Sequence, residues 1–272
     1  MSNLAQAFQK GEQENRALLI GYVSAGYPTV EKSIQIAQAM IKGGVDVLEV
    51  GVPYSDPVMD GPVIQRASEI SLNNGTRTAD VFKVVKAISN LVPALVMTYW
   101  NPVEKYQTNK FAQALTEAGG IGLITPDLTV EESALWIDIS NQLELARVYV
   151  LAQSSTDERI IKVAQESSGF IYAASLMGVT GTRNSVSSGA QTLVERIRSH
   201  SNLPVAVGLG VSNKAQAAEV AKYANAVIVG SAFIKIIQEE SDFNIALQQV
   251  ENLAKDLRSG DRKSTRLNSS HT

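Results

Sequence analysis

The chain has 272 residues, of which 44% are hydrophobic and 19% are charged, and its formal net charge is −3. This is the composition of a globular protein with a sizeable core, and the lack of a dense Lys and Arg run in residues 1–260 argues against nucleic acid or an anionic membrane as a partner. Cysteine is absent and only His200 and His271 occur, which excludes a disulfide framework, a thiolate metal site and a multi-histidine site.

The two ends of the chain differ from the part between them. Residues 1–15 are polar and predict a short helix rather than a signal peptide. No apolar run reaches the roughly 18 residues of a membrane span, so we expect a cytoplasmic protein. Residues 261–272 lack periodicity and read like the translation of a sequencing adapter. We therefore predict one domain over residues 1–260 and a non-native tail over 261–272; the alternative is a natural, basic, disordered tail.

Short runs rich in Val, Ile and Leu alternate with helix-like segments along the whole chain. This alternation predicts βαβ units and a parallel sheet. Eight units favour a closed (β/α)8 TIM barrel over an open doubly wound sheet, whose glycine fingerprint does not follow the first strand. The expected strands are Leu18–Val23, Val45–Val50, Ala94–Thr98, Ile121–Thr125, Arg147–Leu151, Phe170–Ala173, Val205–Val207 and Ala226–Val229. The expected helices are Glu31–Lys42, Ala79–Asn90, Lys110–Ala118, Glu131–Leu143, Glu158–Glu166, Ala190–Ser199, Lys214–Tyr223 and Phe243–Leu257.

The second expected strand carries two acidic residues near its end. Glu49 interrupts an apolar run, where an ionised carboxylate is costly unless it has a partner or a task. Active sites of barrels lie at the carboxyl ends of the strands, so we favour catalysis over a structural salt bridge for Glu49. Asp60 follows in a loop, where a turn residue bonding its own backbone is an equal alternative. Pro62–Asn73 then predicts an extra short helix, and loops with their own structure are usually functional.

Glycine-bearing turns follow the last three expected strands, at residues 178–181, 208–210 and 230–231. In barrels the loops after the seventh and eighth strands often bind phosphate, because glycine lets backbone N–H groups approach an anion and a helix N-terminus adds unpaired donors. Barrel turns are glycine-rich for structural reasons too. Three such turns at successive strand ends nevertheless favour a phosphate site.

The motif LEVGVPYSDP at residues 48–57, followed by DGP at 60–62 and IQ at 64–65, resembles the signature of the tryptophan synthase α chain family. MTYWNP at residues 97–102 fits the same family, and the resemblance covers about residues 15–255. Two places depart from it. Thr129 stands where proline is common, and residues 173–177 differ from versions that read Leu-Leu-Ser-Arg.

The resemblance implies a lyase that cleaves indole-3-glycerol phosphate to indole and glyceraldehyde 3-phosphate. Glu49 matches the residue that moves protons, and Asp60 the anion that stabilises positive charge on the indole nitrogen. No metal or organic cofactor is expected in this chain. The expected partner is the tryptophan synthase β chain, which carries pyridoxal phosphate, in an α2β2 heterotetramer.

The remaining site candidates surround these two carboxylates. We expect an apolar slot that binds the indole and, by resemblance to the family, a set of residues that binds the phosphate. The resemblance also implies that the loop after the second strand and the segment after Gly181 face the partner. The substrate-binding candidates are Tyr22, Tyr99, Leu123, Tyr172 and Leu209 for the slot, together with Asp127, which matches a family motif by resemblance; the phosphate candidates are Gly181, Gly210, Gly230 and Ser231; the partner-facing candidates are Asp56 and Pro57.

Two other functions stay open. Within the same fold, the chain could be a stand-alone indole-releasing lyase or another phosphate-binding barrel such as an isomerase. It could also be a catalytically weak activator of the β subunit, although the presence of both Glu49 and Asp60 argues against a silent protein. Assays with and without the β chain separate these functions.

Overall fold

The structure is a computed structural model that describes residues 3–174, 183–208 and 210–260. Eight parallel strands pair in sequence order, and the pairing of β1 with β8 closes them into a barrel. The expected (β/α)8 barrel is thereby confirmed. The strands are β1 (Leu18–Ser24), β2 (Val47–Gly51), β3 (Ala94–Met97), β4 (Gly122–Thr125), β5 (Ala146–Ala152), β6 (Ile171–Ala174), β7 (Val205–Gly208) and β8 (Ala226–Val229).

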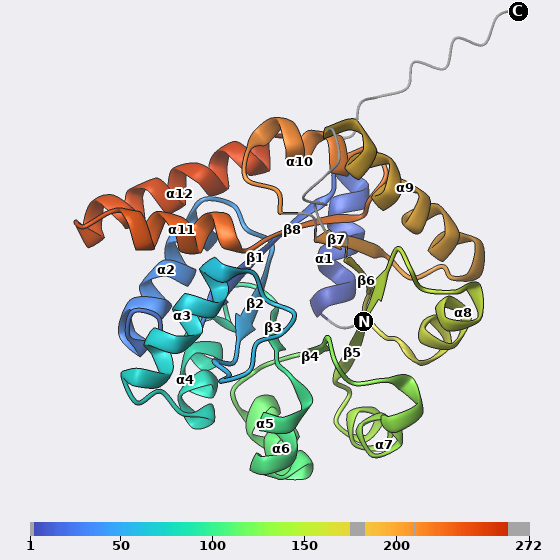
Figure 1. Cartoon of the computed structure of the whole chain (residues 1–272), viewed down its shortest axis with the longest axis horizontal. Helices are drawn as coiled ribbons and strands as arrows, with labels where there is room; N and C mark the ends of the chain where they lie inside the picture. The colour runs from blue at the N-terminus through green and yellow to red at the C-terminus, as the bar shows by residue number, and fades with distance from the viewer. Residues whose placement is uncertain (1–2, 175–182, 209, 261–272) are drawn as a thin grey trace, which may run out of the picture.

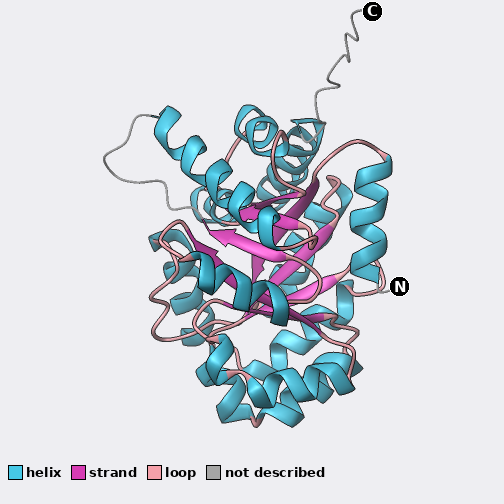
Figure 2. Cartoon of the chain, turned by 90° about the vertical axis from the view of Figure 1, so that its right-hand side faces the viewer, coloured by secondary structure: helices cyan, strands magenta, loops and turns pink. Residues whose placement is uncertain are grey.

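Helices enclose the barrel on its outer side, as Figures 1 and 2 show. The first helices along the described chain are α1 (Asn3–Gln13), α2 (Val30–Lys42), α3 (Pro62–Asn73), α4 (Thr78–Ile88), α5 (Trp100–Tyr106) and α6 (Thr108–Glu117). They are followed by the 3-10 turn η1 (Val130–Glu132), α7 (Ala134–Gln142), α8 (Asp157–Glu166), α9 (Arg183–His200), α10 (Lys214–Ala221), α11 (Ser231–Glu239) and α12 (Phe243–Gly260).

Both faces of the strands are buried, which explains why their sequences read as nearly continuous apolar runs. Successive side chains point to opposite faces. On β1, Ile20 belongs to the cluster inside the barrel, whereas Leu19 and Val23 belong to the cluster between strands and helices. Glu49 lies between Leu48 and Val50, which both belong to the outer cluster, so its own side chain points into the barrel.

The N-terminal helix α1 closes one end of the barrel (Figure 1). Its Leu4 and Phe8 join the interior cluster together with Leu18 and Val47, near the amino ends of β1 and β2. The rings of Phe8 and Phe170 lie 5.9 Å apart. The opposite end, where the carboxyl ends of the strands lie, therefore carries the candidate site.

The loop after β2 contains the extra helix expected from the sequence. Gly61 is the N-cap of α3 and Pro62 its first residue, a position where a missing N–H costs nothing. Ser68 of this helix accepts a hydrogen bond of 2.8 Å from the amide of Tyr54. The arrangement ties α3 back to the loop that bears Asp60.

The structure differs from the expected helices in two places. The single helix predicted over 131–143 is divided into η1 and α7 at Ser133, whose hydroxyl donates to Val130 O at 2.8 Å and accepts from Tyr149 Oη at 2.8 Å. A buried serine with two such bonds competes with the helical backbone pattern. The other difference is α5, which the sequence analysis did not predict as a separate helix. The expected tail 261–272 lies outside the described residues.

Candidate active site

Glu49 is the central group of the site. It lies in β2, and its register partners are Tyr22 on β1 and Leu95 on β3. Only 1% of its surface is exposed, and Oε1 has no hydrogen-bond partner among the described residues. Burial raises the pKa of Glu49 to about 8, because a charged carboxylate loses its hydration there. A carboxyl of this kind is mostly protonated at neutral pH.

Two tyrosines, the buried Tyr22 and the partly buried Tyr172, enter the barrel near Glu49 in a repeated arrangement. Tyr22 pairs with Glu49, and its hydroxyl occupies the place that a Cβ at Gly51, two residues further along β2, would take. Tyr172 pairs with Ala206, and its hydroxyl likewise occupies the place of a Cβ at Gly208. Each glycine therefore makes room for a tyrosine from the preceding strand. Both tyrosines are among the candidates for the predicted indole slot.

The charge of Asp60 acts on the same two tyrosines as Glu49. Burial raises the pKa of Tyr22, and the charge of Asp60 adds to the rise. Burial also raises the pKa of Tyr172, with contributions from Glu49 and then Asp60. Both carboxyl groups thus act on the same pair of phenols, which brings together the two residues predicted as catalytic.

Asp60 is held by its neighbours in its own loop and by Tyr99, which lies in the loop after β3. The Tyr99 hydroxyl donates to Asp60 Oδ2 at 3.2 Å and accepts from the Met59 amide at 2.8 Å. The Gln65 side chain donates to the Asp60 carbonyl at 2.8 Å. Burial raises the pKa of the Asp60 carboxyl, while the bond from Tyr99 opposes this rise. Tyr99, one of the candidates for the indole slot, therefore contacts Asp60 directly.

The prediction for Leu123 needs a correction. Leu123 is fully buried, but it belongs to the outer cluster between strands and helices. Its neighbour Ile124 points into the barrel instead, and so does Met97, its register partner on β3. The alternation of side chains along a strand explains the error, since a shift by one residue changes the face. Ile124 and Met97 are the inward-facing residues that the sequence analysis missed.

Asp127 is engaged with the backbone of another loop. Its Oδ1 and Oδ2 accept hydrogen bonds of 3.0 and 3.1 Å from the amide of Trp100, the first residue of α5. The N-cap of this helix, Tyr99, makes no side-chain cap bond of its own. The carboxylate from the loop after β4 therefore caps a helix that follows β3.

Two of the three predicted glycine turns reach the same rim. Gly210, after β7, has a φ of +66°, a conformation that residues with a side chain rarely adopt. Gly230 is the N-cap of α11, and Ser231 is its first residue. The first amides of a helix have no partner within the helix and favour an anion. Gly181 and Leu209 lie outside the described residues.

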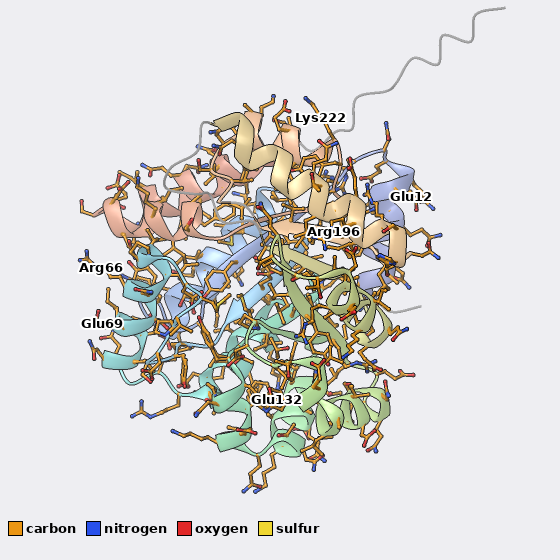
Figure 3. The ribbon with its side chains drawn as sticks, turned by 45° about the vertical axis from the view of Figure 1, so that its right-hand side comes forward. Glu12, Arg66, Glu69, Glu132, Arg196 and Lys222 are labelled. Carbon is orange, nitrogen blue, oxygen red and sulfur yellow. The ribbon has the colours of Figure 1, made fainter. Side chains whose placement is uncertain are left out.

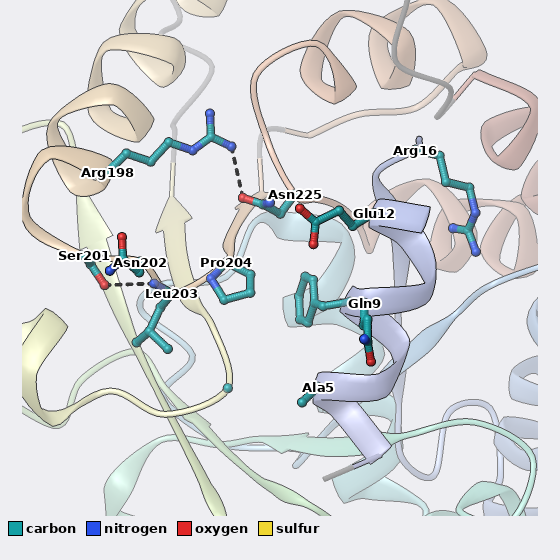
Figure 4. Close-up of a pocket in the computed structure, with 12 residues that line it drawn as sticks. Ala5, Gln9, Glu12, Arg16, Arg198, Ser201, Asn202, Leu203, Pro204 and Asn225 are labelled. Atoms are coloured by element: carbon teal, nitrogen blue, oxygen red, sulfur yellow. Dashed lines mark hydrogen bonds between the residues drawn. The ribbon is translucent and has the colours of Figure 1, made fainter. Parts of the chain in front are cut away.

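A cavity of about 680 Å³ lies at the other end of the barrel, beside α1 (Figure 4). Its wall includes Glu12, Pro204 and Asn225, and the two last residues precede β7 and β8. Arg198 donates to Asn225 Oδ1 at 3.0 Å, as the dashed line in Figure 4 shows. This cavity is separated from Glu49 by the interior cluster.

Several other site types are not found in the part of the chain that the structure describes. Its residues bring together no group of three or more His, Cys, Asp or Glu side chains that could hold a metal ion. Nor does any described helix combine the length and apolar character needed to cross a membrane. Charged side chains such as Arg66 and Glu69 on α3 point away from the barrel (Figure 3).

Fold and site together define a (β/α)8-barrel enzyme with two carboxyl groups of raised pKa, Glu49 and Asp60, on β2 and in the loop that follows it. A family model described as "Tryptophan synthase alpha chain" matches residues 8–262. The tryptophan synthase alpha chain of Thermobifida fusca is 51% identical over 270 residues, which cover 98% of this chain and 100% of that one. That of Streptomyces coelicolor is 52% identical over 251 residues, covering 92% and 93%.

Solved structures agree with the sequence comparison. A tryptophan synthase structure from Mycobacterium tuberculosis superposes with a TM-score of 0.89 at 46% identity, covering 96% of this chain and 98% of that chain. Tryptophan synthase subunit alpha from Legionella pneumophila superposes with a TM-score of 0.86 at 30% identity, with the same shares covered. The chain belongs to the tryptophan synthase alpha chain family. Its activity is the lyase reaction of that family, the cleavage of indole-3-glycerol phosphate in tryptophan biosynthesis.

Proposed function

We propose that Glu49 is the acid–base group of this cleavage and that Asp60 stabilises the charge that develops on the indole. The observation that carries the assignment is the buried Glu49 carboxyl, with Oε1 unpartnered among the described residues and a pKa raised to about 8. General acid–base catalysis works best when the pKa lies near the operating pH. Glu49 can then donate a proton at neutral pH and take one back.

The reaction needs two proton transfers, and one carboxyl group can serve both. Glu49 first protonates C3 of the indole, which turns a poor leaving group into a good one. The C3–glycerol bond then breaks, and its electron pair returns to the indole ring. The proton of the neighbouring glycerol hydroxyl passes to Glu49, and the carbonyl of glyceraldehyde 3-phosphate forms. Glu49 ends the cycle protonated, as it began.

Asp60 is suited to the opposite task. Protonation at C3 leaves positive charge spread over the indole nitrogen, which an anion beside it stabilises. The hydrogen bond from Tyr99 favours the ionised form of Asp60. Two carboxyl groups in different surroundings can divide acid–base and electrostatic roles in this way. The carboxylate also accepts a hydrogen bond from the indole N–H.

The remaining parts of the substrate fit the residues around the carboxyl groups. The indole ring lies between Tyr22 and Tyr172, with Met97 and Ile124 as further apolar contacts from β3 and β4. The phosphate lies at the loops after β7 and β8, supported by the positive φ of Gly210 and by the first turn of α11. The phosphate candidates in the described residues are Gly210, Gly230 and Ser231.

The partner in this proposal is the tryptophan synthase β chain, in an α2β2 heterotetramer. The loop after β2 supports a docking surface there, because Val58 is 80% exposed and Met59 56% exposed, next to Asp56 and Pro57. Large apolar side chains exposed together often mark interaction sites. Pyridoxal phosphate belongs to the β chain in this proposal, and the α chain uses no cofactor. A cytoplasmic location stays a prediction.

The test is indole release by Glu49→Gln, with and without the β chain. Glutamine keeps the shape of the side chain but cannot transfer protons, so the rate falls about 100- to 10,000-fold. A folded Glu49→Gln variant that still releases indole at most of the wild-type rate would overturn the assignment. Wild-type protein that releases no indole but stimulates the β chain would be an activator, and full activity alone would indicate a stand-alone lyase.

A further inference from the structure

Three loops at the rim are joined by hydrogen bonds and by the peptide bond between Tyr99 and Trp100. This connection begins at Asp127, after β4, whose two carboxylate oxygens accept from the Trp100 amide. Trp100 directly follows Tyr99, and the Tyr99 hydroxyl donates to Asp60 Oδ2. The loops after β4, β3 and β2 are therefore linked through four side chains and backbone groups.

Tyr99 is fixed at both of its ends. At the backbone end, its carbonyl accepts a hydrogen bond of 2.8 Å from the Thr98 hydroxyl, and Asp127 holds the next amide. At the phenol end, the hydroxyl bonds both Asp60 and the Met59 amide. Only 5% of Tyr99 is exposed. A shift of the backbone at residues 99–100 thus moves the phenol that holds Asp60.

We propose that Asp127 is a positioning residue for the cleavage reaction. By holding the first amide of α5 it fixes Tyr99, and Tyr99 fixes both the carboxylate of Asp60 and the loop that carries it. The proposal rests on the catalytic role of Asp60 given above. It replaces the expectation that Asp127 contacts the substrate.

The surroundings of Asp127 support an indirect role. Both carboxylate oxygens are engaged with one backbone amide, at the N-terminus of a helix whose N-cap residue makes no side-chain cap bond. The Trp100 ring lies 6.3 Å from the ring of the buried Trp136, so α5 also rests on α7. The Asp127 side chain is exposed to solvent, which makes each single bond weak. Its effect is expected in the geometry of Asp60 rather than in overall folding.

The experiment compares Asp127→Ala, Asp127→Asn and a matched control, Asp80→Ala. Asp80 also accepts a backbone amide at a helix N-terminus, that of Arg77 at 2.9 Å, but on α4, away from Tyr99. For Asp127→Ala we expect kcat of indole release to fall about tenfold, less than the roughly 100-fold that a 1 Å misplacement can cost. KM and the affinity for inorganic phosphate stay within about twofold in that variant. Asp127→Asn keeps an oxygen acceptor and restores most of kcat. Asp80→Ala keeps the wild-type kcat.

A double-mutant cycle tests the path through Tyr99. Tyr99→Phe removes the hydroxyl that bonds Asp60, so Asp127→Ala should lower kcat less in that background than in the wild type. Residues that act through one network are not additive. Effects that multiply independently would overturn the path, and a rise in KM with unchanged kcat would show that Asp127 contacts the substrate instead.

Asp60→Asn, assayed in parallel, separates failure of this inference from failure of the proposed function. If Asp60→Asn keeps the wild-type kcat, the catalytic role of Asp60 is wrong. If Asp60→Asn is slow while Asp127→Ala keeps the wild-type kcat, only the positioning role of Asp127 is wrong. Thermal unfolding of each variant confirms that the comparisons concern folded protein.

Discussion

Tyr22 and Glu49 are register partners across β1 and β2, and both side chains enter the barrel. Both residues are buried, with Tyr22 7% exposed and Glu49 1% exposed. Burial raises the pKa of Glu49 to about 8, so the folded state and the unfolded state bind its proton differently.

The first prediction concerns stability. Glu49 has a folded-state pKa of about 8, whereas an unfolded chain gives a value near ~4.3. Between these values the folded state holds a proton that the unfolded state has released, so folding stability falls as the pH rises through this window. Glu49→Gln has no proton to lose. Its stability advantage over wild type should therefore grow from pH 5.5 to pH 8.5.

Urea unfolding at these two pH values measures the effect. The gain at the higher pH should be on the order of a few kcal/mol, because each pKa unit corresponds to ~1.4 kcal/mol. The exposed Glu69 on α3 provides the control, since Glu69→Gln should change stability little at either pH. An advantage of Glu49→Gln that is equal at both pH values would mean that Glu49 is ionised throughout.

The second prediction concerns Asp60. Asp60→Asn keeps a hydrogen-bond acceptor near Tyr99 but loses the negative charge, so kcat should fall by about 100-fold or more. Affinity for inorganic phosphate should stay unchanged, because the phosphate candidates lie on other loops. Stimulation of the β chain by the folded variant should also persist. Loss of all three properties together would indicate a misfolded loop rather than a lost charge.

The third prediction concerns the phosphate site. Gly230→Asp places a negative charge at the start of α11, where an anion is expected. Substrate affinity should fall at least about tenfold, equivalent to 1.4 kcal/mol. Gly230→Asn has nearly the same size without the charge, and its Cβ would also lie 3.2 Å from Tyr22 Cβ. Equal losses in both variants would show that bulk against Tyr22, not charge, is responsible.

The fourth prediction concerns the partner. Amide hydrogen exchange in residues 52–60 should slow when the β chain is added, because this loop carries the exposed Val58 and Met59. Exchange in α1, at the closed end of the barrel, serves as the internal control and should stay unchanged. Slower amide exchange in α1 alone would mean that the β chain binds at the amino ends of the strands, which would contradict this proposal.

Much of the fold could be predicted from the sequence because the strands are buried on both faces. Runs such as Leu18–Val23 and Ala226–Val229 read as strands without any knowledge of their neighbours. The division of the expected helix at Ser133 could not be predicted in the same way. It depends on a hydrogen bond from Tyr149, on a strand sixteen residues further on, which only the folded chain brings into contact.

In the candidate site, too, local sequence features could be predicted, whereas contacts that depend on tertiary packing could not. Glu49 was found because an acid within an apolar run stands out locally. Leu123 was chosen instead of Ile124 because the face of a strand residue depends on the register between strands, which tertiary packing sets. The contact of Asp127 with the Trp100 amide could not be predicted, because that amide lies 27 residues away in the chain.

Leu4 and Phe8 of α1 fill the barrel at the amino ends of its strands, among the described residues, so in the proposed function the substrate reaches Glu49 from the carboxyl ends of the strands. Both products of the cleavage form together and leave by the same end. A partner protein that receives one of the two products directly would have to bind at that end. The position of α1 at the amino ends of the strands thus fixes the end of the barrel at which such a partner binds.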